Sequence, residues 1–185
     1  GSNILEMFGG ICDGRSFTVT SGTYTLQNVT TYQSLTNSYV DLTGSTITYT
    51  PPSGTTTVIY RFIMNMDSRG YTGIHHQKFF IDSTEVIPAY RSVAPGEYVS
   101  NAHNNQAHVF EYMIQCNADS DDAANGKFTS WTSSKTLKIQ ARRYSATYAC
   151  DIHRNRYRDG GTATGDYVFA APCLLYTSPS PRDIS

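Results

Sequence analysis

Apolar and polar side chains alternate through the stretch from residue 46 to residue 66. Apolar residues take every second position from Val58 to Met66. This period of two predicts a long β-strand with one face in a core. A shorter alternating run covers residues 46–50, and Pro51-Pro52-Ser53-Gly54 separates the two runs. Because proline cannot donate to a sheet ladder, we expect two core strands joined at a corner, which can place them in different sheets.

Further alternating runs cover much of the remaining chain. Residues 108–116 and 135–143 also alternate, with Phe110, Tyr112 and Ile114 on one face of the first run and Leu137, Ile139 and Ala141 on one face of the second. Residues 75–82 and 85–91 predict a hairpin closed by the turn between them. We expect the segment 144–153 to pair with 135–143.

Polar and irregular segments separate these runs. Gly9-Gly10 and Asp13-Gly14 predict turns, and residues 15–31 predict a pair of polar strands or an extended outer segment. The longest expected loop is 94–107, and a second, acidic loop covers 119–127. Both loops are candidate recognition surfaces, because binding residues concentrate on loops held by a rigid scaffold.

The spacing of these runs predicts the fold class. No stretch of the chain spaces its apolar residues as an amphipathic helix does. About nine to eleven short strands separated by turn signals predict an all-β fold, a two-sheet antiparallel β-sandwich. We expect it to be jelly-roll-like, with very little helix.

Composition supports this prediction. The 185 residues are 39% hydrophobic and 16% charged, with a net charge of -1, which is typical of a globular domain. Fourteen Tyr and eight Phe stand against one Trp, a mixture that suits half-buried strands. No apolar run is long enough for a transmembrane helix, so we expect no membrane insertion. The first residues show no signal peptide, and without an initiator Met we expect a cut edge there.

The end of the chain differs from the rest. Residues 173–183 read Cys-Leu-Leu-Tyr-Thr-Ser-Pro-Ser-Pro-Arg-Asp and resemble the translated end of a transposon-based sequencing-library adapter. A disordered Pro/Ser linker is the alternative. On the first interpretation, residues 1–172 are a single β-sandwich domain without its last strand, and 173–185 are a non-native tail. Cys173 would then not be a native cysteine, and the natural protein would continue past Pro172.

Residues able to hold a metal ion lack the required spacing. The cysteines are scattered, at Cys12, Cys116, Cys150 and Cys173, and Cys116 is expected to be a buried free thiol. His75 and His76 point to opposite faces of any regular strand and cannot chelate one ion. The acidic residues between 119 and 122 lack the calcium-loop pattern. We therefore predict no metal and no cofactor.

Catalytic chemistry finds no support in the spacing of the carboxylates. Asp82, Glu85 and Glu111 could serve glycoside hydrolysis only as a close pair, and nothing in the sequence brings two of them together. We predict no catalytic residue, and we predict that the protein is not an enzyme.

The most basic stretch is 151–161, where arginines recur at Arg154, Arg156 and Arg158. On a strand, this spacing puts three guanidinium groups on one face. Such a face could bind phosphate, sulfate or an acidic sugar. The alternative is a solvated strand rim balanced by the aspartates at either end. The near-neutral net charge argues against nucleic acid as a partner.

Several motifs together resemble a known group of proteins. They are Ile4-Leu5-Glu6, Cys12-Asp13-Gly14, Ser21-Gly22-Thr23-Tyr24-Thr25, the run Leu42 to Pro52, Val58-Ile59-Tyr60, and Ser130-Trp131-Thr132-Ser133 through Leu137. They resemble β-sandwich virion structural and fibre-like proteins of marine phages and algal viruses, and the resemblance covers most of residues 4–172. These motifs mark strands and turns and not active-site residues, so the resemblance implies a fold and a viral context more than a chemical activity.

The resemblance implies a non-enzymatic virion component. We expect a fibre, spike or capsid-decorating domain that associates as a homotrimer and can attach to a glycan or receptor on the host surface. The alternative is a carbohydrate-binding module of a secreted or cell-surface protein, and a hydrolase without a site motif is a weaker third. The candidate surface-binding residues are His103, Asn104, Asn105, Arg154, Arg156 and Tyr157.

Overall fold

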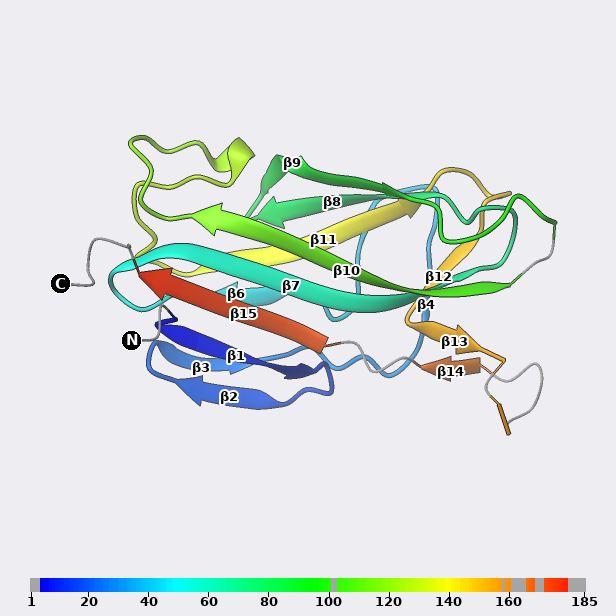
Figure 1. Cartoon of the computed structure of the whole chain (residues 1–185), viewed down its shortest axis with the longest axis horizontal. Helices are drawn as coiled ribbons and strands as arrows, with labels where there is room; N and C mark the ends of the chain where they lie inside the picture. Colours follow the sequence, from blue (N-terminus) through cyan, green and yellow to red (C-terminus); the bar gives the residue numbers. More distant parts are fainter. Residues whose placement is uncertain (1–3, 101–102, 158, 161–165, 169–171, 180–185) are drawn as a thin grey trace.

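The computed structural model describes residues 4–100, 103–157, 159–160, 166–168 and 172–179. The protein is all-β and sandwich-like, as predicted, with antiparallel strands in two main sheets (Figure 1). Within the described ranges, the 3-10 turn η1 (Ala123–Asn125) is the one helical element. No helix in this part of the chain is long and apolar enough to cross a membrane.

The first sheet is organised around β7 (Thr55–Ser68), the long strand that the alternation predicts. One edge of β7 pairs along most of its length with β10 (Asn104–Gln115). The other edge of β7 pairs with β15 (Pro172–Pro179) and with β12 (Cys150–Ile152). β15 pairs in turn with β1 (Glu6–Ile11), and β12 pairs in turn with β4 (Gln33–Ser34).

The second sheet is built on β11 (Lys135–Arg143). Its neighbours are β8 (His75–Ile81) and then β9 (Thr84–Val93) on one side, and β5 (Val40–Asp41) and β6 (Ile47–Tyr49) on the other. The β8–β9 hairpin confirms the prediction, and Asp82 adopts a left-handed φ of 54° at its turn. β6 and β7 lie in different sheets on either side of the proline corner.

Two small hairpins complete the fold. β2 (Ser16–Val19) pairs with β3 (Gly22–Thr25), as the polar-strand interpretation predicted. β13 (Arg154–Arg156) pairs with β14 (Asp166–Val168). The sequence also predicts that residues 167–171 begin a last strand. β14 contains the first two of these residues, and residues 169–171 lie outside the described residues.

The core lies between the two main sheets. The inward side chains of β7, from Val58 to Met66, are at most 1% exposed. Phe79 of β8 contacts both Tyr60 of β7 and Phe110 of β10, with ring centroids 5.1 and 5.5 Å apart. Each large side chain buried in this way contributes about 1.5–3 kcal/mol of hydrophobic stabilisation. The period-two pattern therefore identified the core face correctly.

Two predictions about turns and pairing are wrong. Gly9-Gly10 lies inside β1, where it pairs with β15. A Cβ on Gly10 would be 2.8 Å from the Phe17 ring. Glycine permits this close approach of the β2–β3 hairpin and does not mark a turn. Residues 150–152 of the segment 144–153 pair with β7 and β4 of the first sheet and not with β11. The chain crosses between sheets after a turn in which Tyr148 N–H donates to Ser145 O at 3.1 Å.

The predicted loop 94–107 is also too long. β10 already begins at Asn104, because its first residues continue the ladder to the end of β7, where Asn104 pairs with Ser68. The acidic loop 119–127 contains η1. These two loops flank β10 and lie at opposite ends of the molecule (Figure 1). They do not form one continuous surface.

Residues of the expected non-native tail occupy a central position. β15 pairs with β1 on one side and with β7 on the other, and Cys173, Leu175 and Thr177 are buried. Strand pairing uses backbone groups that every non-proline residue carries. The pairing is therefore compatible with either origin of residues 173–179, and their adapter origin stays a prediction.

Candidate functional site

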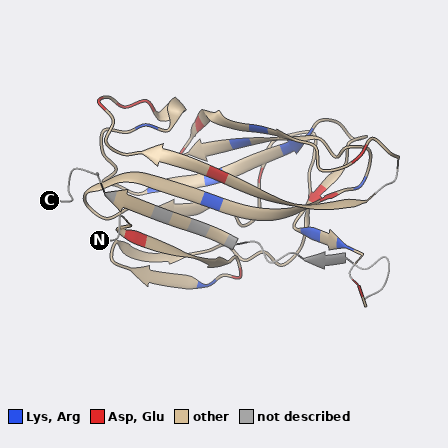
Figure 2. Ribbon diagram, viewed as in Figure 1, with Lys and Arg blue, Asp and Glu red and all other residues tan. Residues whose placement is uncertain are grey.

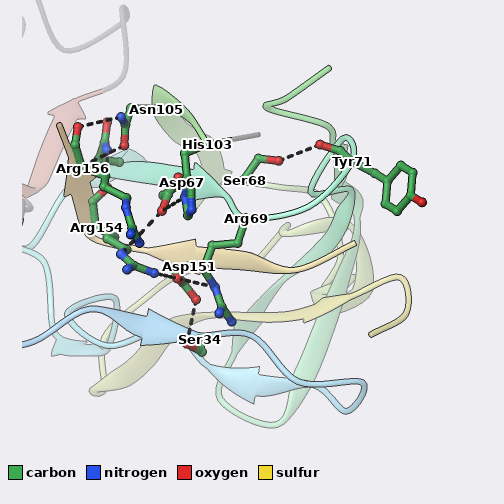
Figure 3. Close-up of polar contacts among 11 residues, drawn as sticks. Ser34, Asp67, Ser68, Arg69, Tyr71, His103, Asn105, Asp151, Arg154 and Arg156 are labelled. Carbon is green, nitrogen blue, oxygen red and sulfur yellow. Dashed lines mark hydrogen bonds and ion pairs between the residues drawn. The ribbon is translucent and has the colours of Figure 1, made fainter. Parts of the chain in front are cut away.

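The structure brings the candidate binding residues together at one end of the sandwich. Asn105 of β10 bonds the backbone of Arg156 in both directions, accepting from its N–H at 3.1 Å and donating to its carbonyl at 2.9 Å. The rings of His103 and Tyr157 lie edge to face with centroids 5.7 Å apart. Asn104 begins β10, and Arg154 begins β13. The chain segments 103–105 and 154–157 thus form one neighbourhood (Figure 3).

Two buried aspartates lie beneath this neighbourhood. Asp67 of β7 and Asp151 of β12 are directly opposite in the antiparallel register, and both are fully buried. Like charges at directly opposite positions destabilise a sheet, and burial adds a large desolvation cost. This strand pair can therefore form only with compensating cations.

Arg154 supplies the central compensation. Its guanidinium is ion-paired with Asp151, and its Nε lies 3.5 Å from a carboxylate oxygen of Asp67. It also lies over the ring of Tyr32, 4.6 Å from the centroid. Arg154 is 4% exposed, so these interactions form away from solvent screening. We call Asp67, Asp151, Arg154, Arg69, His103 and Ser34 the buried polar cluster; Arg69 and Ser34 lie at its exposed edge.

The other members complete the hydrogen bonding of the carboxylates. Arg69 Nε lies 2.7 Å from Asp151, and Ser34 Oγ donates to Asp151 at 2.6 Å. His103 Nδ1 is 3.0 Å from both carboxylate oxygens of Asp67. Burial raises the pKa of Asp67, whereas the hydrogen bond from His103 and the charge of Arg154 act against that rise. The cluster joins β4, β7, β12, β13 and the start of β10.

This geometry corrects the interpretation of the basic stretch. Arg154 points inward to the aspartates and not onto a shared exposed face, because the acidic pair beneath β13 attracts it. It is balanced by Asp151, as the alternative interpretation held, but in a buried site and not at a solvated rim. Arg158 lies outside the described residues. A row of three guanidinium groups for an anion is therefore not supported by the described residues.

Sequence reasoning missed Asp67, Arg69 and Ser34. The alternation along β7 places Asp67 on the opposite face of the strand from the core residues, so it predicts that the Asp67 side chain is exposed. It is buried because β12, β13 and the chain before β10 cover that end of the sheet. Only the long-range pairing reveals this, and no local signal could have found it.

The buried polar cluster contains a serine and a histidine but not a catalytic arrangement. Ser34 donates to Asp151, whereas His103 bonds Asp67, so the two side chains are held by different carboxylates. A serine nucleophile requires a base within hydrogen-bond reach. What this arrangement can do is fix several chain segments at one end of the sandwich.

Other candidate groups are dispersed. His75 is fully buried and His76 is half-buried on the other face of β8, which confirms that they point to opposite faces. Among the described residues, no group of three or more potential ligands is placed to hold a metal ion.

Cys116 is a buried free thiol, as predicted. It lines a pocket of about 490 Å³ with Trp131 and the proline corner, and burial raises its pKa to about 12, which keeps it protonated and unreactive near neutral pH.

Comparisons with known proteins place few constraints on function. No protein-family model matches the chain, and no curated protein matches it. Among solved structures, it is similar to the structure of infectious bursal disease virus Gx strain, with 10% identity and a TM-score of 0.37, over 94% of this chain and 37% of that chain. The crystal structure of infectious bursal disease virus VP2 subviral particle gives 12% identity and a TM-score of 0.27, over 90% of this chain and 43% of that one. The chain spans less than half the length of these viral chains.

Proposed function

We propose that this protein is a non-enzymatic structural component of a virion, a fibre, spike or capsid-decorating domain that associates as a homotrimer. The observation that carries the proposal is the outer face of the first sheet. The sequence motifs that resemble virion structural proteins support the same role. The proposal includes attachment to the host surface through the loops at the ends of the sandwich, which the two sheets hold as a rigid scaffold.

The outer face of the first sheet carries exposed apolar side chains around one ion pair, Arg61–Glu111. Outward side chains of β1, β7 and β10 are exposed or half-buried there, and we call the following set the sheet face: Met7, Ile11, Ile59, Ile63, Val109 and Met113. Met113 is 62% exposed and Met7 is 56% exposed. Large exposed apolar patches mark interaction sites in soluble proteins. Subunit contact in an assembly would cover this surface.

The charges of the sheet face suit contact between identical copies. Arg61 of β7 and Glu111 of β10 lie opposite each other in register, with Arg61 Nη2 2.5 Å from Glu111 Oε2. Figure 2 shows a blue band on β7 beside a red band on β10. The two charges therefore neutralise each other within one chain and leave no net charge to oppose contact between copies.

Substitution at the sheet face tests the proposal. Met113→Glu places a charge in the proposed contact, and we expect it to reduce the particle mass measured by light scattering after gel filtration from a trimer to a single chain. The matched control is Ile87→Glu on β9, where the side chain is similarly exposed at 59% but lies on the second sheet. The control should remain a trimer. A wild-type protein with the mass of one chain would overturn the proposed assembly.

The second candidate function is a carbohydrate-binding module of a secreted or cell-surface protein. The observation that favours it is the pocket of about 490 Å³ near the proline corner, which Trp131 and the hydroxyl side chains of Ser53, Thr55 and Ser130 line. Such a module would be a monomer, so the same mass measurement separates the two functions.

A further inference from the structure

Four tyrosines from three separate loops meet at the end of the sandwich that carries the buried polar cluster. Tyr71 follows β7, Tyr98 follows β9, and Tyr144 and Tyr148 follow β11. The three loops leave the same end of the molecule, on the right in Figure 1. Ring centroids are 4.7 Å apart for Tyr71 and Tyr98, 5.7 Å for Tyr71 and Tyr148, and 5.5 Å for Tyr144 and Tyr148. We call these four residues the tyrosine surface.

The tyrosine surface is exposed to solvent. Tyr98 is 70% exposed and Tyr144 is 56% exposed, while Tyr71 and Tyr148 are half-buried beside them. Tyrosine offers a large, rigid contact area that is apolar on the ring and polar at the hydroxyl, at a small cost in side-chain entropy. Tyrosine is also among the residues enriched at binding hot spots.

The loops that carry these rings are fixed by tight backbone packing. A Cβ on Gly96 would lie 2.5 Å from Ser68 Oγ, and a Cβ on Gly73 would lie 2.8 Å from Ser68 Cβ. Ser68 Oγ donates to Tyr71 O at 2.8 Å, and Tyr71 N–H donates to Val99 O at 3.1 Å. Tyr71 itself is held in the left-handed region, at φ 46°. The surface is therefore preorganised, which lowers the entropic cost of binding.

The neighbouring cations are engaged by the fold. Arg69, next to Tyr71 in the loop, is ion-paired with Asp151 (Figure 3). Arg142 Nη1 donates to Tyr144 O at 3.4 Å, and Arg143 Nε donates to Asn37 at 2.8 Å. These guanidinium groups repel a cationic ligand. They already interact with groups of the protein, which leaves them less able to bind an anionic ligand. The rings also contact one another directly, which leaves no slot between them for a cation.

We propose that the tyrosine surface binds a neutral oligosaccharide. Sugar rings present an apolar C–H face that can stack on exposed tyrosine rings, and their hydroxyls can exchange hydrogen bonds with the phenol groups. This inference names the class of partner for the host attachment included in the proposed function. It does not depend on assembly, because the sheet face lies on different strands.

Saturation-transfer NMR with defined hexasaccharides tests the inference. The probes are cellohexaose, laminarihexaose, mannohexaose and chitohexaose, with hexagalacturonate as the acidic comparison. We expect transfer to at least one neutral probe and weaker transfer to hexagalacturonate. For the neutral probe that binds, Tyr98→Ala and Tyr144→Ala should each raise the dissociation constant about three- to tenfold, the range for loss of one aromatic contact.

Two controls separate the tyrosine surface from general effects. Ile87→Ala removes another exposed apolar side chain, 59% exposed, from β9 and outside the three loops, and binding should be unchanged. Met113→Glu should bind as wild type does, whatever its mass, so failure of the assembly and failure of this inference are distinguishable. No transfer to any neutral probe, stronger binding of hexagalacturonate, or full binding by Tyr98→Ala would each overturn the inference.

Discussion

Arg154→Met tests the account of the buried polar cluster. The substitution keeps an unbranched side chain of similar length and removes the cation between two carboxylates that face each other in register. Asp67 and Asp151 are fully buried, so water cannot screen their repulsion without opening this end of the sheet. Breaking a buried ion pair by removing one partner costs about 3–5 kcal/mol. We expect the free energy of unfolding to fall by this amount.

Urea unfolding followed by tyrosine fluorescence or circular dichroism measures the change. For a domain of this size, the same loss corresponds to a fall in Tm of roughly 6–20 °C. The matched variant is Arg154→Met combined with Asp67→Asn and Asp151→Asn, which removes the repelling charges together with the cation. It should recover at least about half of the loss, because neutral amides do not need the missing guanidinium.

The result that would refute this reasoning is a small effect of Arg154→Met, below about 1 kcal/mol, which is the range of a solvent-exposed ion pair. A triple variant that is less stable than Arg154→Met would also contradict it. That outcome would mean that the two aspartates stabilise the fold through Arg69, Ser34 and His103 even without Arg154.

Two further predictions concern acid stability and loop packing. Burial lowers the pKa of His75 from 6.5 to about 4, so the stability that the neutral ring contributes is complete above pH 6.5 and is lost as the pH falls toward 4. In urea unfolding, the wild type should lose about 2–3 kcal/mol more stability than His75→Gln between pH 7 and pH 4.5. Equal losses in the two proteins would count against this assignment. Gly96→Ala should lower stability by about 1–3 kcal/mol through overpacking against Ser68. The control is Gly54→Ala, where no atom lies within 4 Å of the added Cβ and only the positive φ disfavours alanine. We expect this variant to lose about 1 kcal/mol. The steric explanation fails if both variants unfold at the same urea concentration.

Local alternation predicted those parts of the fold in which a strand and its neighbour are close in sequence. The β8–β9 hairpin and the core face of β7 follow from which residues alternate, because period-two patterning fixes a strand and the side it buries. The break at Pro51-Pro52 also separated two sheets correctly. These features need no information about distant residues.

Partners that are distant in sequence could not be predicted in the same way. Residues 150–152 join β7, more than 80 residues earlier in the chain, and no short-range signal distinguishes this from pairing with the adjacent β11. The direction of Arg154 depends on that choice, since its acidic partners meet only once β12 lies beside β7. The wrong prediction of a turn at Gly10 has the same origin, because the Phe17 ring that requires a glycine there belongs to another strand.

The candidate site shows the same division. The residue types and the two segments 103–105 and 154–157 could be selected from the sequence, and the structure places them side by side. The burial of Arg154 could not be predicted, because it depends on β12 lying beside β7. The tyrosine surface could not be predicted, because it depends on three loops converging at one end of the sandwich.

The central claim is that the sheet face is a contact between copies of this chain, and the solution mass of the wild-type protein tests it most directly. Light scattering after gel filtration, repeated over a range of concentrations, should give the mass of three chains. A mass of one chain at every concentration would contradict the claim and would favour the carbohydrate-binding module.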